Sequence, residues 1–322
     1  MKNKLIVLGM MLIMPVEASI WGFYAHKKIN RLAVFTLPIE MIGFYKHHLE
    51  YLTESAVNPD RRRYAVKQEA ARHYIDIDHY GDSAIYKIPK FWNDAVDTYS
   101  EDTLLAYGII PWHVNKMKYR LTDAMRVGDT RNILQLSADL GHYIADANVP
   151  LHTTLNYNGQ LTDQHGIHGL WESRLTELFS EGYDFFVGKA TYISNPQLEI
   201  WAAITQAHLA LDTVFNSEKE ITEKYGYDKK YSFETRGRST VKVYSFEFSE
   251  SYHKALRGMV ERQMTKSVKM VGDFWYTCWV DAGQPDLNKL IGFEFSDQEL
   301  AERRAKLKAW KEKTYESRLH EY

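Results

Sequence analysis

The sequence predicts an all-α protein folded as a single-domain helical bundle. Beyond the first twenty residues, apolar side chains recur three or four positions apart through most of the chain, which is the period of an amphipathic helix. No segment gives a convincing hairpin signal, and the chain of 322 residues is long enough to bury a large core. Residues 142–172 gather histidine and carboxylate side chains, so we expect the bundle to be built around a multi-zinc site.

The first twenty residues (1–20) have the form of a secretory signal peptide. Lys2 and Lys4 give a positive start, and residues 5–14 are almost wholly apolar. This apolar run is too short to span a membrane as a mature helix, although an uncut anchor is the alternative. We therefore expect a mature domain at residues 21–322. Its only cysteine is Cys278, so its stability must come from the core and from bound metal.

Five stretches of the mature chain carry apolar stripes that predict helices. They span residues 24–36, 131–147, 168–180, 197–215 and 252–280. The stripes include Ile29, Leu32, Ala33 and Phe35; Ile133, Leu136, Leu140 and Ile144; Leu170, Trp171, Leu175 and Leu178; Leu198, Trp201, Ile204 and Leu211; and Leu256, Met259, Val271 and Trp275. Asp129 and Thr130 have the character of an N-cap for the second helix.

Two later segments have a different composition. The stretch from Tyr225 to Tyr244 is rich in Gly, Lys and Tyr, and we interpret it as a long loop. Residues 296–299, Ser-Asp-Gln-Glu, have the form of a capping box and open a charged C-terminal helix over about 295–322. The many charges on this helix indicate a solvated element rather than a binding arm.

The bulk composition argues against a strongly charged partner. The formal net charge is −2 and the pI about 6.7, so no global field attracts nucleic acid. This weakens a role in nucleic-acid binding without excluding it, because bound zinc supplies local positive charge. Apolar residues make up 45% of the chain and charged residues 25%, which is typical of a soluble globular protein.

Residues 142–172 are the most informative segment, because potential metal ligands occur there at helical spacing. His142 and Asp146 lie four residues apart, so on a helix their side chains project from one face. Pro150 has no amide proton and is expected to end that helix just before it. His152 follows this break, on chain that can turn back toward a metal ion.

A second pair repeats this spacing. His168 and Glu172 are also four residues apart, and imidazole with carboxylate is a ligand combination of catalytic zinc. A single histidine on an apolar helix face is more often a core residue, but two pairs and a turn histidine in one segment indicate more than one metal ion. His165, on a Gly-rich approach to His168, lies either near the ligands or simply in the loop.

Five sequence elements occur in a characteristic order. They are Trp21-Gly22 with His26; Asp60, thirteen residues before His73; the run His73-Tyr74-Ile75-Asp76; His142 with Asp146 and His152; and His168 with Glu172. This order resembles the superfamily that groups bacterial zinc-dependent phospholipases C with fungal single-strand-specific nucleases. The Trp21 to His26 spacing is similar to the nuclease branch. Glu172 is similar to the phospholipase branch, because the fungal nucleases carry Asp there.

The resemblance implies three zinc ions. It assigns the first to Asp60, His73, His142 and Asp146. It assigns the second to His152, His168 and Glu172. It assigns the third to the amino group and carbonyl of Trp21, to His26 and to the shared carboxylate of Asp146. Only a mature chain that begins at Trp21 offers that amino group, and Ile20 is a poor residue before a cleavage site.

The resemblance also implies a chemistry in which zinc-activated water attacks phosphorus. Asp60 and Asp146 are the candidate catalytic residues, Asp60 because it would orient or deprotonate the water and Asp146 because it would bridge two ions. Tyr74, Asp76 and Asn156 are the candidate substrate-binding residues. Asp76 would either fix the orientation of His73 or contact a substrate base, as its counterpart does in the fungal nucleases.

We therefore expect a secreted or periplasmic zinc-dependent hydrolase of phosphoric diesters. Phospholipid is the favoured substrate because of Glu172, the absence of paired cysteines and the lack of a basic face. The alternative is a single-strand-specific nuclease that releases nucleotides, with Tyr74 as the stacking aromatic. A second alternative is a non-catalytic zinc-binding protein, although closed structural sites are usually richer in Cys. A lipid substrate implies transient contact with a membrane surface, and no obligate protein partner is evident.

Overall fold

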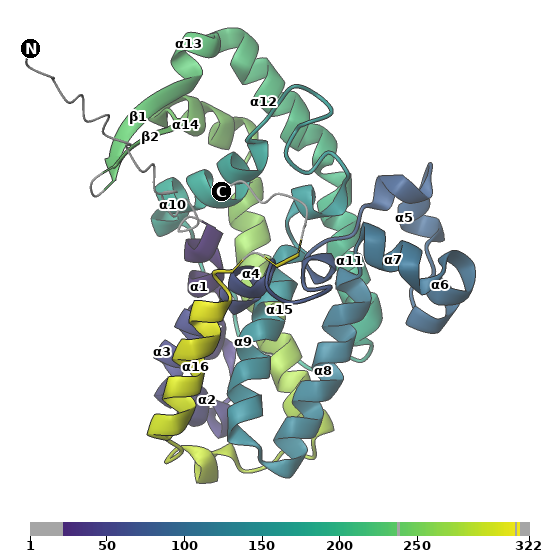
Figure 1. Cartoon of the computed structure of the whole chain (residues 1–322), viewed down its shortest axis with the longest axis vertical. Coiled ribbons are helices and arrows are strands. Elements are labelled where there is room, and N and C mark those ends of the chain that lie inside the picture. Colours follow the sequence, from purple (N-terminus) through teal and green to yellow (C-terminus); the bar gives the residue numbers. More distant parts are fainter. Residues whose placement is uncertain (1–21, 237–238, 313, 316–322) are drawn as a thin grey trace, which may run out of the picture.

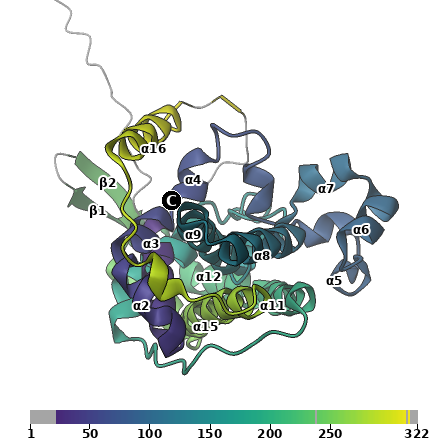
Figure 2. The same ribbon diagram turned by 90° about the horizontal axis from the view of Figure 1, so that it is seen from below.

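Four helices of the chain pack together around its core. The computed structural model describes residues 22–236, 239–312 and 314–315. Helices α1 (Gly22–Ala33), α8 (Ile110–Val127), α9 (Thr130–Asp146) and α15 (Met259–Asp281) are neighbours in space, and α8, α9 and α15 run alongside one another in both views (Figures 1 and 2). Helix makes up 69% of the structure, which confirms the predicted all-α class.

The start and end of α9 follow directly from its sequence. The Asp129 carboxylate accepts a hydrogen bond from the backbone amide of Asn132 (3.1 Å), which confirms the predicted N-cap. Gly128 ends α8 directly before this cap with a φ of 70°, a conformation that glycine adopts without steric cost. After α9 ends at Asp146, Pro150 opens the short 3-10 turn η4 (Pro150–Thr153). The predicted break before this proline is therefore present.

Buried apolar side chains from these helices form a continuous core. The predicted stripe of α9 lies wholly inside it: Ile133, Leu136, Leu140 and Ile144 are all buried. Trp275 of α15 is fully buried, and its indole N–H donates to the Ser137 carbonyl (3.1 Å). Cys278 is a buried free cysteine in the same core, which agrees with a packing role.

Four of the predicted helices consist of more than one element in the structure. Residues 197–215 form α11 (Pro196–Leu209) and the first part of α12 (Leu211–Tyr225), and residues 252–280 cover the end of α14 (Phe246–Ala255) and most of α15. The second division falls at Arg257 and Gly258, whose φ angles of 50° and 75° interrupt a right-handed helix. Residues 168–180 form the π-helical turn η5 (Gly169–Arg174), α10 (Leu175–Phe179) and the start of η6 (Ser180–Gly182). The helix predicted over 24–36 is α1 followed by the 3-10 turn η1 (Val34–Thr36).

A β-hairpin occupies most of the segment predicted as a loop. Strands β1 (Tyr231–Arg236) and β2 (Ser239–Tyr244) pair antiparallel, with Tyr231 opposite Tyr244 and Phe233 opposite Lys242. The loop prediction was wrong because each strand alternates polar and apolar residues over only a few positions, which is a weak signal. The hairpin lies at the edge of the molecule in both views (Figures 1 and 2).

Short helices and turns link the longer helices. They are α2 (Ile39–His47), α3 (Leu49–Ser55), α4 (Asn58–Arg62), α5 (Ala84–Lys87), α6 (Trp92–Tyr99), α7 (Glu101–Tyr107), α13 (Tyr227–Lys230), η2 (Ala70–Arg72), η3 (Ile77–Tyr80) and η7 (Leu287–Leu290). Within the described parts of the chain, no helix combines the length and the apolar character needed to cross a membrane.

The charged C-terminal helix is α16 (Asp297–Ala309), which ends before the predicted limit. Ser296 and Glu299 form the predicted capping box, and no side chain of α16 is buried, as expected for a solvated helix. Arg303 nevertheless donates to Ser55 Oγ (2.8 Å) and so joins α16 to α3. The predicted signal peptide (residues 1–20), Trp21 and residues 316–322 lie outside the described residues.

Candidate metal centre

The structure describes eight of the nine predicted ligands and brings all eight together in the interior. They come from α1 (His26), α4 (Asp60), the residue after η2 (His73), α9 (His142 and Asp146), η4 (His152), and η5 with the residue before it (Glu172 and His168). Their exposed fractions range from 0% to 8%. The ninth predicted ligand, Trp21, lies outside the described residues. Three buried groups among these side chains have donor atoms close enough to hold metal ions.

The first set consists of Asp60, His73, His142 and Asp146. His73 Nδ1 lies 2.9 Å from Asp146 Oδ2 and 3.0 Å from His142 Nε2. Asp60 Oδ1 lies 3.6 Å from each of these two nitrogen atoms. Ligand atoms of tetrahedral zinc, with bonds of about 2.0–2.1 Å, are separated by about 3.3–3.4 Å. The distances within the first set are therefore compatible with zinc.

The second set consists of His152, His168 and Glu172. The two histidine Nε2 atoms are 3.3 Å apart, and Glu172 Oε2 lies 3.4 Å from His152 Nε2 and 2.7 Å from His168 Nε2. Three protein donors leave a fourth position of a tetrahedral ion for water or substrate, as in catalytic zinc sites. The predicted His168 and Glu172 pairing is present, but on a π-helical turn rather than an α-helix. Such turns are frequent at functional sites.

His26 defines the third set, together with His142 and Asp146, and it also contacts Glu172. Its Nε2 atom lies 3.4 Å from Asp146 Oδ1 and 3.4 Å from Glu172 Oε1. Its ring stacks on that of His142, with centroids 4.0 Å apart. The predicted Asp146 contact is thus present, whereas the Glu172 contact was not predicted. Each carboxylate directs one oxygen to His26 and the other to the first or second set, so the three sets adjoin one another.

Backbone carbonyls fix the orientation of the second-set histidines. His152 Nδ1 lies 2.7 Å from the His73 carbonyl oxygen, and His168 Nδ1 lies 3.1 Å from the Tyr157 carbonyl oxygen. Donation of Nδ1–H to these carbonyls leaves Nε2 of both rings free of a proton and directed toward the second set. The contact between His152 and His73 also joins the first and second sets through the backbone.

Burial and charge set the protonation of the ligands in the metal-free protein. Burial lowers the pKa of His73 to about 4, so its imidazole is neutral at pH 7. Burial also disfavours a charged His26, but hydrogen bonding to Glu172 and the charges of Asp146 and Asp60 outweigh it and raise its pKa to about 9. Burial would raise the pKa of Asp146 and Glu172, but nearby histidines hold both pKa values well below the ordinary range. The carboxylates are therefore ionised and suited to a cation.

Arg63 is a buried cation beside these sets. It is only 2% exposed, and its Nε and Nη1 atoms have no hydrogen-bond partner among the described residues. Its charge is close enough to add to the lowering of the His73 pKa and to oppose the raising of the His152 pKa. In the sequence it belongs to the run of three arginines at 61–63, which is more typical of a solvated surface. In the sequence, the only indication of a phosphate-binding role was that this run of arginines directly follows Asp60.

The three candidate substrate-binding residues have contacts within the protein. Tyr74 is 9% exposed, and its hydroxyl lies 3.5 Å from the Ala106 carbonyl. Asp76 is buried, and its backbone amide donates to the Tyr107 carbonyl. The Asn156 amide donates to Thr162 and accepts from the Leu161 backbone, which stabilises the loop before His168. Their roles toward substrate stay predictions. His165 is exposed and lies outside the three sets.

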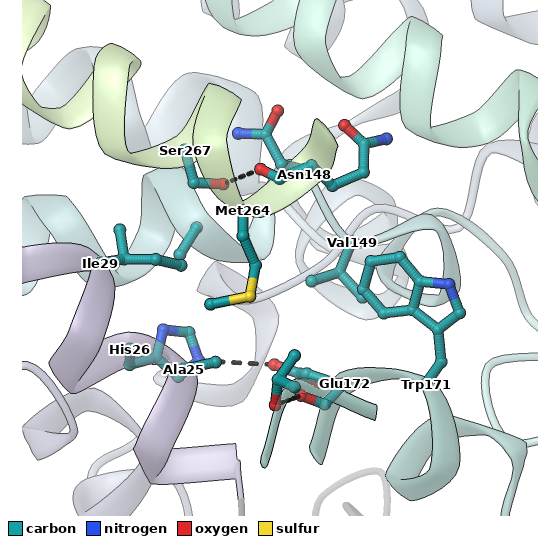
Figure 3. Close-up of a pocket in the computed structure, with 12 residues that line it drawn as sticks. Ala25, His26, Ile29, Asn148, Val149, Trp171, Glu172, Met264 and Ser267 are labelled. Atoms are coloured by element: carbon teal, nitrogen blue, oxygen red, sulfur yellow. Dashed lines mark hydrogen bonds and ion pairs between the residues drawn. The ribbon is translucent and has the colours of Figure 1, made fainter. Parts of the chain in front are cut away.

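A small cavity borders His26. Its wall includes His26, Glu172, Asn148, Trp171 and Met264, and Figure 3 shows His26 joined to Glu172 at its edge. Its accessible volume of about 20 Å³ suits a single water molecule.

Comparison with known proteins gives no match, either to a family model or to a curated protein.

Proposed function

We propose that this chain is a zinc-dependent hydrolase of phosphoric diesters. The observation that carries the proposal is the position of a buried guanidinium, that of Arg63, beside the first and second sets; its Nε and Nη1 atoms have no hydrogen-bond partner among the described residues. Structural zinc sites are closed and usually rich in Cys, whereas these sets contain only imidazole and carboxylate donors. A buried arginine with unpaired N–H groups suits an anionic group, and arginine binds phosphate oxygens in bidentate fashion.

The residues divide the work of the reaction. Zinc bound at these sets would polarise the phosphoryl group and supply an activated water at neutral pH. Asp60, a member of the first set, would orient or deprotonate the attacking water. Asp146 and Glu172 hold the neighbouring sets together, because the two oxygens of each carboxylate contact histidines of different sets. Arg63 donates hydrogen bonds to the phosphoryl oxygens as charge develops on them.

Phospholipid is the favoured substrate of the proposed reaction. Glu172 is similar to the phospholipase branch of the superfamily that the sequence resembles, and the chain carries no excess of basic residues. Tyr74, which would stack a base, is almost wholly covered in this structure. The second candidate is a single-strand nuclease, which the spacing of Trp21 and His26 favours. We propose a secreted or periplasmic location on the basis of residues 1–20.

The test offers purified, zinc-loaded protein phosphatidylcholine micelles and denatured DNA together and follows both by phosphorus NMR. Appearance of phosphocholine supports the lipid assignment, and appearance of nucleotides supports the nuclease instead. The Asp146→Asn variant should lose either activity by orders of magnitude. Asp163→Asn is the matched control, because Asp163 is an exposed carboxylate of the loop before His168 and belongs to none of the three sets. Turnover of neither substrate, with zinc bound, favours a non-catalytic zinc-binding protein.

A further inference from the structure

A buried charged cluster lies behind His73, on the side away from the first set. Glu69, fully buried, is at its centre, and its Oε1 atom lies 3.1 Å from Arg62 Nη2. Its Oε2 atom accepts from Arg72 Nη1 (2.6 Å), and Oε1 also accepts from the Tyr143 hydroxyl. Arg62 in turn pairs with Asp139 (3.0 Å). No part of the proposed reaction uses this cluster.

The cluster connects the elements that supply the first set. Arg62 lies on α4, two residues after Asp60, and Tyr143 follows His142 on α9. Glu69 lies four residues before His73. The contacts of Glu69 with Arg62 and Tyr143 therefore hold together the chain segments on which the first-set ligands depend.

His73 has one nitrogen toward the first set and the other toward Glu69. Its Nδ1 atom lies 2.9 Å from Asp146 Oδ2, whereas its Nε2 atom is buried without a hydrogen-bond partner among the described residues. Glu69 Oε1 lies 3.9 Å from that Nε2 atom. When Nδ1 binds a cation, a neutral imidazole must carry its proton on Nε2. A small rotation of the ring would then bring Nε2–H within hydrogen-bond distance of Glu69.

We propose that Glu69 is a positioning residue, which accepts the Nε2–H of His73 and so holds Nδ1 toward the metal ion of the first set. The inference rests on metal binding by the first set, which the proposed function requires. A carboxylate that accepts from a metal-bound histidine fixes the tautomer and the ring orientation, and its loss lowers metal affinity by about 10–100-fold. The ion pairs with Arg62 and Arg72 keep Glu69 ionised.

The test compares Glu69→Gln with the parent protein in two backgrounds. His168→Gln removes a second-set donor, so that Zn²⁺ titration by calorimetry reports mainly on the first set. His142→Gln removes a first-set donor and reports mainly on the second. Glu69→Gln should weaken Zn²⁺ binding by about 10–100-fold in the His168→Gln background and leave it unchanged in the His142→Gln background. Equal affinity with and without Glu69 in the first background would overturn the proposal.

Glu218→Gln is the matched control for the loss of a buried, paired carboxylate. Glu218 is 1% exposed and pairs with Lys230, but it has no contact with His73. This variant should be less stable than the parent protein but keep the Zn²⁺ affinity of the first set. If its Zn²⁺ affinity falls as much as that of Glu69→Gln, general destabilisation explains both results.

A spectroscopic readout decides the matter even if Glu69→Gln does not fold. In ¹⁵N-labelled wild-type protein loaded with Zn²⁺, long-range ¹H–¹⁵N correlation should show His73 protonated at Nε2 and bound through Nδ1. Binding through Nε2 would overturn the proposal. This readout does not depend on hydrolysis, so failure of the proposed reaction and failure of the Glu69 role are distinguishable.

Discussion

The carboxamide of Asn30 lies directly against Gly141 where α1 crosses α9. A Cβ atom at position 141 would overlap Asn30 Oδ1, so glycine is required for this approach. Asn30 is fully buried, and its Nδ2 atom donates to the Ala138 carbonyl (3.0 Å). One turn earlier on α1, His26 stacks on His142, the residue after Gly141. The contact between Asn30 and Gly141 therefore sets the distance between the third set and the first.

Gly141→Ala should disrupt this crossing. Alanine favours a helix by up to about 1 kcal/mol over glycine, but Asn30 cannot move away without losing its buried hydrogen bonds, so we expect a net loss of about 1–3 kcal/mol. We also expect weaker metal binding by the third set. Both effects are measurable, by urea unfolding and by metal content after dialysis.

Gly272→Ala provides a matched comparison for this prediction. A Cβ atom at Gly272 of α15 would overlap Thr36 Oγ1, so the helix packing is equally close but lies away from the donors. This variant should lose a comparable amount of stability and keep its metal. Equal metal loss in both variants would mean that the crossing of α1 and α9 has no special role in metal binding.

Arg63→Gln should reduce hydrolysis while leaving metal content unchanged. Because Arg63 is proposed to donate to the phosphoryl oxygens as charge develops, we expect kcat to fall by about 10²-fold or more. Arg61→Gln is the neighbouring control, because Arg61 is only partly buried and contacts Asn58 and the Phe23 ring. Full activity of Arg63→Gln in a steady-state assay would remove Arg63 from the proposed mechanism.

The sequence was most informative where ligands lie close together along the chain. His142 with Asp146, and His168 with Glu172, were predicted from a spacing of four residues, because one turn of helix brings such side chains together. Asp60 and His73 have no local pattern and entered only through the resemblance to a family. The second contact of Glu172, with His26, depends on how η5 packs against α1 and so has no local signal.

The other differences between the sequence-based predictions and the structure also have physical reasons. The division between α11 and α12 falls at Ala210, a residue that favours helix, so neither glycine nor proline marks it. The hairpin was missed because its two strands are short and carry charged residues between the apolar ones. Arg63 was assigned to the surface because a run of charged residues is usually solvated, and only the tertiary fold buries its third member.

The stability of the metal-free protein should depend on pH through His26. The folded-state pKa of about 9 lies above the ordinary value of 6.5, because contacts with Glu172, Asp146 and Asp60 outweigh burial. Charged His26 therefore stabilises the folded state fully below about pH 6.5, and this contribution is lost as the pH rises through about 9. For chelated protein we expect the free energy of unfolding to fall by up to about 3 kcal/mol over this range.

Urea unfolding at a series of pH values measures this dependence. The His26→Gln variant should give a flatter profile over the same range, since it lacks the titrating group. A wild-type profile as flat as that of the variant would contradict the prediction. Bound Zn²⁺ should also remove the dependence, because a ligated imidazole stays neutral.

The buried pair of Lys230 and Glu218 should have a large effect on stability when only one partner is removed. Lys230 Nζ lies 2.5 Å from Glu218 Oε1, and the two residues are 2% and 1% exposed. The centroids of four aromatic rings lie 5.5–5.8 Å from Lys230 Nζ. The rings are those of Tyr227, Tyr231, Tyr244 and Phe248. Lys230→Met leaves a buried carboxylate uncompensated, so we expect a loss of about 3–5 kcal/mol in urea unfolding. The double variant Lys230→Met with Glu218→Met should be less destabilised than Lys230→Met alone, because no buried charge remains; equal losses in the two variants would contradict this account.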